Sequence, residues 1–421
     1  MKVVLVNTMQ SGGGAAIAAM RLFGALKKAG TDTEFIAAAG KGGDGITVLS
    51  NGFTSKLRYK FNFVAERLII WLNNRLSRRN LFAVSIANSG FDITRLKAVR
   101  EADIIHLHWV NQGLMSVTGI KKLIALGKPV VITAHDMWYC TAICHHSYGC
   151  ERFVSGCKEC RFLAAPSEND LSAHVWRRKS GMFGDNVTFV ALGGWIKEQI
   201  ERSGLTRGVR TVTIPNSVEI SVFSPSADRS EERRKRGIAD SDKVIIFGAA
   251  KLNDPIKGAE ILFEAISQSR YAEQTVLVLF GNIKDDDDFL NRIPCRYIYT
   301  GSIADQKEQA GWYAAADIAA IPSHYETLPQ VMIEAQACGT PAVAFDSAGQ
   351  KDIIEHKRNG YLARYPDIAD LTVGIEWLFE NTGEEMRNYT ADSARLRFSP
   401  EYVAEEHIKL YKTLFKRLND E

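Results

Sequence analysis

The sequence lacks a long apolar run, a strong excess of one charge and any internal repeat. Its apolar start, 1–10, meets Gly12 too soon to be a secretory signal or a membrane span, so we expect a cytoplasmic protein with reduced thiols. With 52 basic and 49 acidic residues, the net charge of +3 favours no nucleic-acid partner. The 421 residues, 46% of them hydrophobic, suffice for two or three globular domains.

Short apolar segments alternate with helical stretches along most of the chain. The first series of predicted strands lies at 3–6, 104–107 and 130–133. The second lies at 244–247, 276–280, 296–299, 318–321 and 342–345. This alternation predicts an α/β fold of two doubly wound, Rossmann-like domains, each a parallel sheet with helices on both faces. Segment 213–225 and the charge run 228–236 separate the series, so we place the domains at 1–223 and 224–399.

Two glutamates eight positions apart, Glu326 and Glu334, lie where a strand is predicted to turn into a helix. Pro322 ends the strand, and Pro329 suits the first turn of a helix, where its missing N–H costs nothing. A helix start favours a phosphate or another anion. Carboxylates touching that anion would repel it, so we expect them to accept hydrogen bonds from sugar and ribose hydroxyls beside it. The alternative is a plain strand–helix unit with two solvated glutamates.

Two further groups of residues follow predicted strands. Glycines at 12–14 let backbone N–H groups approach an anion, which makes Gly13 and Gly14 candidates for the donor phosphate or the acceptor side; the alternative is a tight turn. Lys251 and Lys257 provide two cations for two phosphate charges, although isolated lysines are usually solvated.

Histidines mark the ends of two first-domain strands. His106 and His108 lie on the same side of their strand, so we expect only His108 to clear its end. His135 and Asp136 follow the next strand. A histidine satisfied within the core or rim is the alternative for both His108 and His135.

The segment from Ile321 to Pro341 resembles the E-x7-E signature of retaining glycosyltransferases of family 4, which have the two-domain GT-B fold with domains facing across a cleft. The resemblance implies that Glu326 holds donor-sugar hydroxyls and Glu334 the ribose. Lys257, helped by Lys251 and the turn N–H groups of Thr327 and Leu328, would hold the diphosphate. Lys251 departs from the commoner Arg, and the spacing to Lys257 is about one residue longer than usual.

The resemblance extends to both domains. Gly301 and Ser302 match the position where the family's backbone meets the nucleobase. His135 looks like the cleft histidine near the transferred sugar, with Asp136 holding its ring or facing the acceptor; His108 is assigned to the acceptor side. The linker departs from the family at Ser217 and Glu219, where Gly and Asp are usual. The C-terminal helix, 400–421, resembles the helix that crosses back to the first, acceptor-side domain, whereas 224–399 would bind the donor.

The function that the resemblance implies is transfer of a hexose-type sugar from a nucleotide-diphosphate sugar to a saccharide or lipid-linked saccharide in bacterial polysaccharide biosynthesis. Catalysis would need no metal or other cofactor and would depend on Glu326, His135 and Lys257. Attack on the same face, guided by the leaving phosphate, is the usual proposal for this retaining family. Alternatives are a sugar-nucleotide epimerase or a phosphorylase on the same fold and, more distantly, a zinc-organised binding module without turnover.

Five of the seven cysteines lie within the 21 residues from Cys140 to Cys160. The C-x2-C spacing of Cys157 and Cys160 is that of a zinc half-site, which Cys144 and Cys150 would complete as a structural, non-catalytic centre. Reduced cysteines that pack the loop, or a disulfide, are the alternatives.

Segment 56–80 predicts a basic amphipathic helix. Its apolar residues recur at helical spacing: Leu57, Phe61, Val64, Leu68, Trp71 and Leu72. The segment contains one acidic residue, Glu66, and seven basic ones: Lys56, Arg58, Lys60, Arg67, Arg75, Arg78 and Arg79. Such a helix suits the anionic inner face of the cell membrane, near a lipid-linked acceptor. The alternative is a helix packed on the first domain with a solvated basic face.

Overall fold

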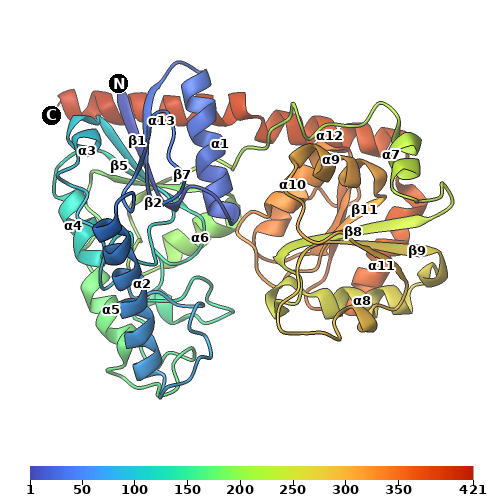
Figure 1. The fold of residues 1–421 in the computed structure, drawn as a ribbon, viewed down its shortest axis with the longest axis horizontal. Coiled ribbons are helices and arrows are strands. Elements are labelled where there is room, and N and C mark those ends of the chain that lie inside the picture. Colours follow the sequence, from blue (N-terminus) through green and yellow to red (C-terminus); the bar gives the residue numbers. More distant parts are fainter. Residues whose placement is uncertain (421) are drawn as a thin grey trace. The chain divides into compact units, whose positions relative to one another are not determined.

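The computed structural model describes residues 1–420, with side chains described to residue 417. It contains two compact units (Figure 1). The first unit comprises Met1–Pro215 and Val403–Glu421, and the second comprises Asn216–Tyr402. Residue 421, the last of the predicted C-terminal helix, lies outside the described residues.

The first unit is built on a seven-stranded parallel sheet in the order β3-β2-β1-β4-β5-β6-β7. Its strands are β1 (Lys2–Met9), β2 (Asp32–Ala39), β3 (Ile46–Val48), β4 (Ile104–Leu107), β5 (Val130–Ala134), β6 (Val187–Ala191) and β7 (Arg210–Thr213). Its helices are α1 (Gly14–Lys28), α2 (Phe53–Asn73), α3 (Lys97–Glu101), α4 (Val117–Ile124), α5 (Leu171–Lys179), α6 (Gly194–Arg202) and, from Val403 on, α13 (Pro400–Asp420).

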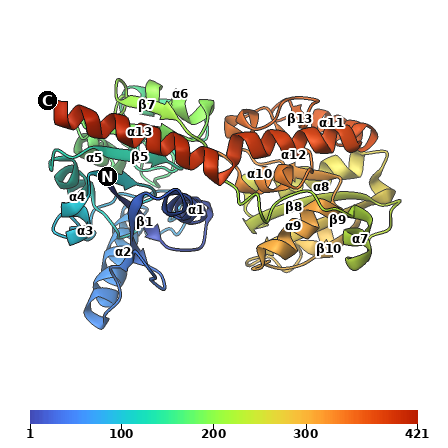
Figure 2. The ribbon, with the colours of Figure 1, turned by 90° about the horizontal axis from the view of Figure 1, so that it is seen from above.

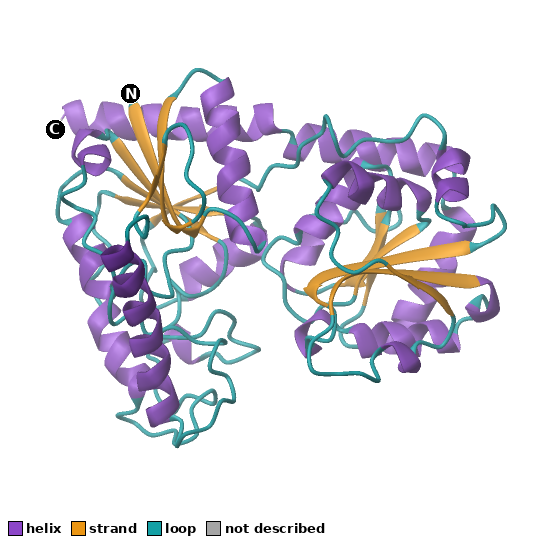
Figure 3. Ribbon diagram, in the orientation of Figure 1, coloured by secondary structure: helices purple, strands orange, loops and turns teal. Residues whose placement is uncertain are grey.

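The second unit is built on a six-stranded parallel sheet in the order β10-β9-β8-β11-β12-β13. Its strands are β8 (Lys243–Lys251), β9 (Thr275–Asn282), β10 (Arg296–Tyr299), β11 (Ile318–Ile321), β12 (Ala342–Phe345) and β13 (Gly360–Ala363). Its helices are α7 (Arg229–Lys235), α8 (Ala259–Gln268), α9 (Gln306–Ala315), α10 (Gln330–Ala337), α11 (Ile368–Asn381) and α12 (Glu384–Phe398). Figure 3 shows helices on both faces of this sheet, with α8 beside α11 and α10 beside α12.

Local sequence explains how these elements begin and where they are buried. The central strands β4 and β5 are buried at every position, as expected of parallel strands covered on both faces. An Asp or Ser side chain accepts a backbone N–H at the start of five helices; these caps are Ser116, Asp170, Asp228, Asp305 and Asp367. The predicted α/β class, with two doubly wound parallel sheets, is confirmed.

The strand order of each sheet reverses at its first strand. The reversal falls between β1 and β4 in the first unit and between β8 and β11 in the second. Connections after these neighbouring strands leave in opposite directions, which opens a crevice at the carboxyl ends of the strands, where ligands of such sheets bind. Each unit therefore has one sheet position at which a ligand is expected.

Helix α13 completes the core of the first unit. Its buried side chains Val403, Leu410 and Tyr411 pack in one cluster with Val3 and Leu5 of β1. Figure 2 shows this long C-terminal helix from above. No helix in the part of the chain that is described is long and apolar enough to cross a membrane.

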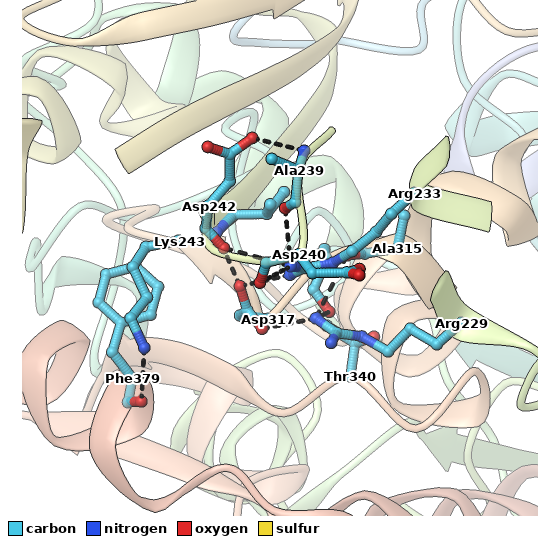
Figure 4. Close-up of polar contacts among 12 residues, drawn as sticks. Arg229, Arg233, Ala239, Asp240, Asp242, Lys243, Ala315, Asp317, Thr340 and Phe379 are labelled. Atoms are coloured by element: carbon cyan, nitrogen blue, oxygen red, sulfur yellow. Dashed lines mark hydrogen bonds and ion pairs between the residues drawn. The ribbon is translucent and has the colours of Figure 1, made fainter. Parts of the chain in front are cut away.

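At the amino end of β11, Asp317 ties several elements of the second unit together (Figure 4). Its carboxylate lies 2.5 Å from Arg229 and 2.7 Å from Arg233, both on α7, and accepts a hydrogen bond from the N–H of Val244. Arg233 is buried. It also donates to the carbonyl oxygen of Ala315, at the end of α9, and to those of Ala239, Asp240 and Asp242, which precede β8. This cluster lies at the opposite end of β11 from the ligand position.

Replacing Asp317 with Asn removes the charge that compensates buried Arg233, so we expect the free energy of unfolding to fall by about 3 kcal/mol. Urea denaturation followed by circular dichroism measures the change. Glu405→Gln, which breaks an exposed pair with Lys409, is the control and should cost less than about 1 kcal/mol. Equal losses in the two variants would contradict this role for Asp317.

Candidate functional site

The turn after β8 places Lys257 against the turn after β11. Asp254 caps a single helical turn, Pro255–Lys257, by accepting the N–H of Ile256. Gly258 then takes a positive φ of 73°, and a Cβ there would lie 2.2 Å from the carbonyl oxygen of Pro322. Only glycine allows this approach. As a result, Lys257 Nζ lies 2.6 Å from Glu326 Oε1.

The environment of Lys257 keeps its ammonium group charged. Burial lowers the pKa of Lys257, but the carboxylates of Glu326 and Asp254 together raise it by more, so the pKa lies above its ordinary value. Two hydrogen bonds hold the turn that carries Glu326. Gly349 donates its N–H to the carbonyl oxygen of Glu326, and the side chain of Gln350 donates to the carbonyl oxygen of Ser323. A fixed cation and a fixed carboxylate thus stand together at the β8/β11 reversal.

Glu334 lies just over one turn into α10, and its side chain is buried. Its Oε2 accepts hydrogen bonds from Gln309 Nε2 at 3.2 Å and from the Tyr313 hydroxyl at 3.4 Å. Burial and the neighbouring Glu334 charge hold the pKa of Tyr313 well above its usual range, so the phenol remains a donor. Sequence reasoning missed Gln309 and Tyr313, although their four-residue spacing puts both on one face of α9.

The remaining predicted donor residues lie around the same edge of the second sheet. Lys251 is the last residue of β8, and Thr327 and Leu328 are buried in the turn before α10. Gly301 and Ser302 follow β10. They are joined to the end of β9, because Gly281 donates its N–H to the Gly301 carbonyl at 2.8 Å. Of these predicted donor residues, Lys257 and Glu326 are the pair joined by an ion pair.

In the first unit, the predicted glycines form the start of α1. Gly13 has a φ of 81° and caps the helix, which begins at Gly14. A Cβ added at either glycine would meet open space, so no packing contact requires their lack of a side chain. Because glycine has no side chain, the backbone N–H groups of these two residues at the start of α1 are not covered by side chains of their own.

His106 in β4, His108 just after it and His135 just after β5 form one stack of rings. The ring of His108 lies 4.3 Å from that of His106, and its Nδ1 is 2.9 Å from Nε2 of His135. His106 in turn contacts the hydroxyls of Tyr411 and Thr133, each at 2.7 Å. As predicted, His106 lies within β4, which ends at Leu107, and His108 lies just beyond its end. The side chain of His108 is nevertheless buried, at 2% exposed, and reaches His135.

Burial makes these imidazoles weak bases. It lowers the pKa of His106 and His108 well below 6.5 and that of His135 to about 4. The rings are therefore neutral at pH 7, each with one nitrogen that donates and one that accepts. A neutral pair suits the short contact between His108 and His135, in which one ring donates to the other.

Asp136 fastens the loop after β5. Its Oδ2 accepts hydrogen bonds from Trp109 Nε1 at 2.9 Å and His145 Nδ1 at 2.7 Å, while Oδ1 accepts the N–H of Trp138. Burial raises the pKa of Asp136, but His145, His146 and the N–H of Trp138 together lower it by more, to about 2. The carboxylate holds Trp109 and His145 rather than the ring of His135, which corrects one of the two roles expected for it.

The predicted zinc ligands line one small pocket without forming a metal site. The four cysteines are free thiols: Cys144, Cys150, Cys157 and Cys160. Within residues 1–420, no group of three or more His, Cys, Asp or Glu side chains is arranged to hold a metal ion. The predicted four-thiolate centre is therefore not found.

Other contacts order this loop in place of a metal. Cys144 packs in an apolar cluster with Val84 and Ile143. Lys179, fully buried, donates to the carbonyl oxygens of Trp138 and Thr141 at 2.6 and 3.0 Å, and burial lowers its pKa to about 7. Burial disfavours the thiolate too, so it raises the pKa of the Cys157 thiol to about 12 and that of Cys160 to about 11. These cysteines are thus neutral thiols that pack the loop.

Comparisons with known families cover almost the whole chain. Residues 12–222 match the family model described as Glycosyltransferase Family 4, and residues 228–397 match the model described as Glycosyl transferases group 1.

Curated relatives match more locally. A D-inositol 3-phosphate glycosyltransferase of Jonesia denitrificans is 33% identical over 160 residues, which are 34% of this chain and 37% of that protein. The protein of the same description from Corynebacterium jeikeium is 28% identical over 215 residues, 48% of this chain and 51% of that protein. The chain therefore spans about half or less of the length of these relatives.

Solved structures match over the full length. Sucrose-phosphate synthase from Thermosynechococcus elongatus has a TM-score of 0.69 at 18% identity and covers 99% of both chains. HepE from Anabaena, solved in complex with UDP and glucose, has a TM-score of 0.64 at 17% identity and covers 98% of this chain and 100% of its own. At these identities the likeness establishes the fold.

The buried histidines predict an acid-sensitive protein. His106, His108, His135 and His407 bind a proton more weakly in the folded than in the unfolded state, so stability is full above about pH 6.5 and falls as the pH decreases towards 4. The expected loss is on the order of 1 kcal/mol per pH unit for each of these rings. Urea midpoints measured between pH 7 and pH 5 test this, with His407→Gln expected to flatten the slope. A midpoint that stays constant over this range would contradict the burial of neutral rings.

Proposed function

Because the chain belongs to glycosyltransferase family 4 and has the GT-B fold, we propose that it transfers a sugar, with retention of configuration, from a nucleotide-diphosphate sugar to a saccharide or lipid-linked saccharide. The observation that carries this proposal is the contact of Lys257 with Glu326 at the β8/β11 reversal, beside the start of α10. A cation, a carboxylate and a helix N-terminus at one point suit a phosphorylated sugar better than a plain surface turn.

The second unit is proposed to bind the donor. Lys257, with Lys251 and the N–H groups of Thr327 and Leu328, would hold the diphosphate, while Gly301 and Ser302 would meet the nucleobase. Glu326 would accept hydrogen bonds from the sugar hydroxyls. Glu334 would accept those of the ribose, held in place by Gln309 and Tyr313.

The ion pair prepares both partners for this task. Without a donor, Glu326 keeps Lys257 charged and close to the turn. When a diphosphate lies beside Lys257, the ammonium faces a second anion, which lets the carboxylate accept sugar hydroxyls. Members of this family typically work without a metal, and a fixed ammonium with helix N–H groups provides positive charge where the leaving diphosphate becomes negative.

The proposed reaction exchanges one bond for another at the anomeric carbon. The bond to the diphosphate oxygen breaks, and an acceptor hydroxyl attacks the face that the diphosphate leaves. The hydroxyl proton passes to the leaving phosphate oxygen, so the products are the glycoside and a nucleoside diphosphate. Lys257 stabilises the charge on that phosphate during bond cleavage.

The first unit is proposed to bind the acceptor. His135, a neutral ring fixed by His108, would donate a hydrogen bond near the transferred sugar, and the start of α1 at Gly13 and Gly14 would face donor phosphate or acceptor. Asp136 would act on the acceptor side by holding Trp109 and His145. Nucleotide sugars are cytoplasmic metabolites, so we place the reaction in the cytoplasm, as a hexosyl transfer in polysaccharide synthesis.

Nucleotide binding tests the donor site first. Isothermal titration calorimetry with UDP, GDP, ADP and dTDP should show selective binding, with UDP the first candidate because HepE was solved with it. Glu334→Gln keeps the side-chain volume but removes the charge that would bind the ribose, so we expect affinity for the selected nucleotide to fall about 10- to 100-fold. Glu308→Gln, on an exposed residue of α9, is the control. Equal affinities of the two variants would refute the ribose assignment.

Turnover tests Lys257. With water as acceptor, release of nucleoside diphosphate from the matching nucleotide sugar reports bond cleavage without knowledge of the natural acceptor. Lys257→Met removes the cation from the leaving group, so we expect the rate to fall about 100-fold or more with little loss of stability. Lys307→Met, on the exposed start of α9, should keep the wild-type rate. A wild-type rate in Lys257→Met would remove this residue from the site.

A further inference from the structure

Helix α2 buries polar side chains and exposes apolar ones. Of its buried side chains, Asn62, Glu66 and Arg67 are polar and Ile70 is apolar, and the buried Asn74 caps its C-terminal end. A helix that packs on a globular core normally buries its apolar stripe and leaves its polar face in water. Figure 2 shows α2 projecting from the body of the first unit.

Hydrogen bonds fix this orientation. Glu66 Oε1 accepts from the Ser85 hydroxyl and from the N–H groups of Ile86 and Ala87, at 2.5 to 2.9 Å. Its Oε2 lies 3.0 Å from Arg67, which also donates to the carbonyl of Val84 at 3.1 Å. These buried charges are paired, so rotating the helix to bury its apolar side would leave them without partners.

Two amides hold the helix at either end of this polar face. Asn62 Nδ2 donates to the carbonyl of Gly113 at 3.3 Å. Asn74 donates to the carbonyl of Arg79 and accepts the N–H of Ala164 at 3.0 Å. The orientation of α2 is therefore specified over its second half, from Asn62 to Asn74.

The outer face of α2 is an exposed apolar stripe. Its side chains are 47% to 84% exposed: Phe53, Leu57, Phe61, Val64, Leu68 and Leu72. At 3.6 residues per turn they fall within a band about 100° wide. Leu76 and Phe82, beyond the end of the helix, are 57% and 60% exposed and add to the same segment. Contiguous apolar surface of this kind marks an interaction site.

The exposed charge around the stripe is of one sign. Segment 53–80 holds a single acid, Glu66, which is buried. Its exposed cations are Lys56, Arg58, Lys60, Arg75, Arg78 and Arg79. By the helical spacing, Lys56 and Lys60 lie on one flank of the stripe and Arg58 on the other. An apolar band between cations fits a surface that offers both acyl chains and negative headgroups.

We propose that the outer face of α2 docks the protein on an anionic lipid surface, with the stripe entering the boundary between headgroups and acyl chains. Lys56, Lys60 and the arginines at 75, 78 and 79 then contact the headgroups. A second copy of this chain would bring like charges together around the stripe, which disfavours self-association through this face. Docking on a membrane would also hold the enzyme beside a lipid-linked acceptor, but the proposal depends only on α2.

Vesicle co-sedimentation of the full chain tests the proposal, with no nucleotide or acceptor present, so the result is independent of the proposed reaction. The wild type should sediment with vesicles of phosphatidylcholine and phosphatidylglycerol, and much less with phosphatidylcholine alone or at high salt. The double variant Phe61→Gln and Leu68→Gln should lower the partition constant about tenfold or more. Lys56→Gln with Lys60→Gln should weaken binding and its salt dependence.

The matched control is Leu396→Gln, which removes a 74% exposed leucine from α12 in the second unit and should bind vesicles like the wild type. All substituted side chains are exposed, so melting temperatures and nucleotide binding should stay unchanged. A wild type that remains free of anionic vesicles would overturn the proposal. So would equal vesicle binding by wild type and Phe61/Leu68 variant. A dimer that this variant dissociates, without vesicle binding, would assign the stripe to a second copy instead.

Discussion

The turns after β8 and β11 approach each other so closely that a Cβ at Gly258 would collide with the carbonyl oxygen of Pro322. This contact follows from the strand order of the second sheet, which makes β8 and β11 neighbours although 66 residues separate the end of one from the start of the other. It brings Lys257 to Glu326 and places both beside the start of α10. The proposed chemistry depends on this convergence, because a diphosphate and its sugar need positive charge and a hydroxyl acceptor within a few ångströms of each other.

The first unit uses the same topology with different chemistry. At the reversal between β1 and β4 the side chains are neutral histidines, held in a stack by each other and by hydroxyls of β5 and α13. Tyr411 of the C-terminal helix reaches His106, so the last helix supports the row of rings that ends at His135. The unit proposed to bind the donor has a charged pair at its reversal, and the unit proposed to bind the acceptor has neutral rings, which suits a phosphate and uncharged hydroxyls respectively.

Much of the fold followed from the sequence, because buried parallel strands are short apolar runs separated by helices. The contact between Lys257 and Glu326 could be predicted once both residues were assigned to neighbouring strand ends. The partners of Glu334 were not, since Gln309 and Tyr313 belong to a different helix whose packing no local pattern specifies. The burial of His108 and the bonding of Asp136 to His145 depend on tertiary contacts as well, and so does the ordering of the cysteine loop by Lys179.

Helix α2 shows the limit of pattern reasoning most clearly. Its sequence predicts an amphipathic helix, and general experience places the apolar side inward. Only the contacts of Glu66 and Arg67 reveal that the polar side is the buried one. The same spacing of residues thus has two opposite structural meanings, and the choice between them is made by groups outside the helix.

The most direct test of retaining sugar transfer is the stereochemistry of the released sugar. Time-resolved proton NMR of a nucleotide α-linked sugar, incubated with the enzyme and with water as acceptor, distinguishes the two anomers before they equilibrate. Retention of configuration predicts that the α anomer appears first, together with nucleoside diphosphate. Initial appearance of the β anomer, or an intact donor after prolonged incubation with folded enzyme that binds the nucleotide, would contradict it.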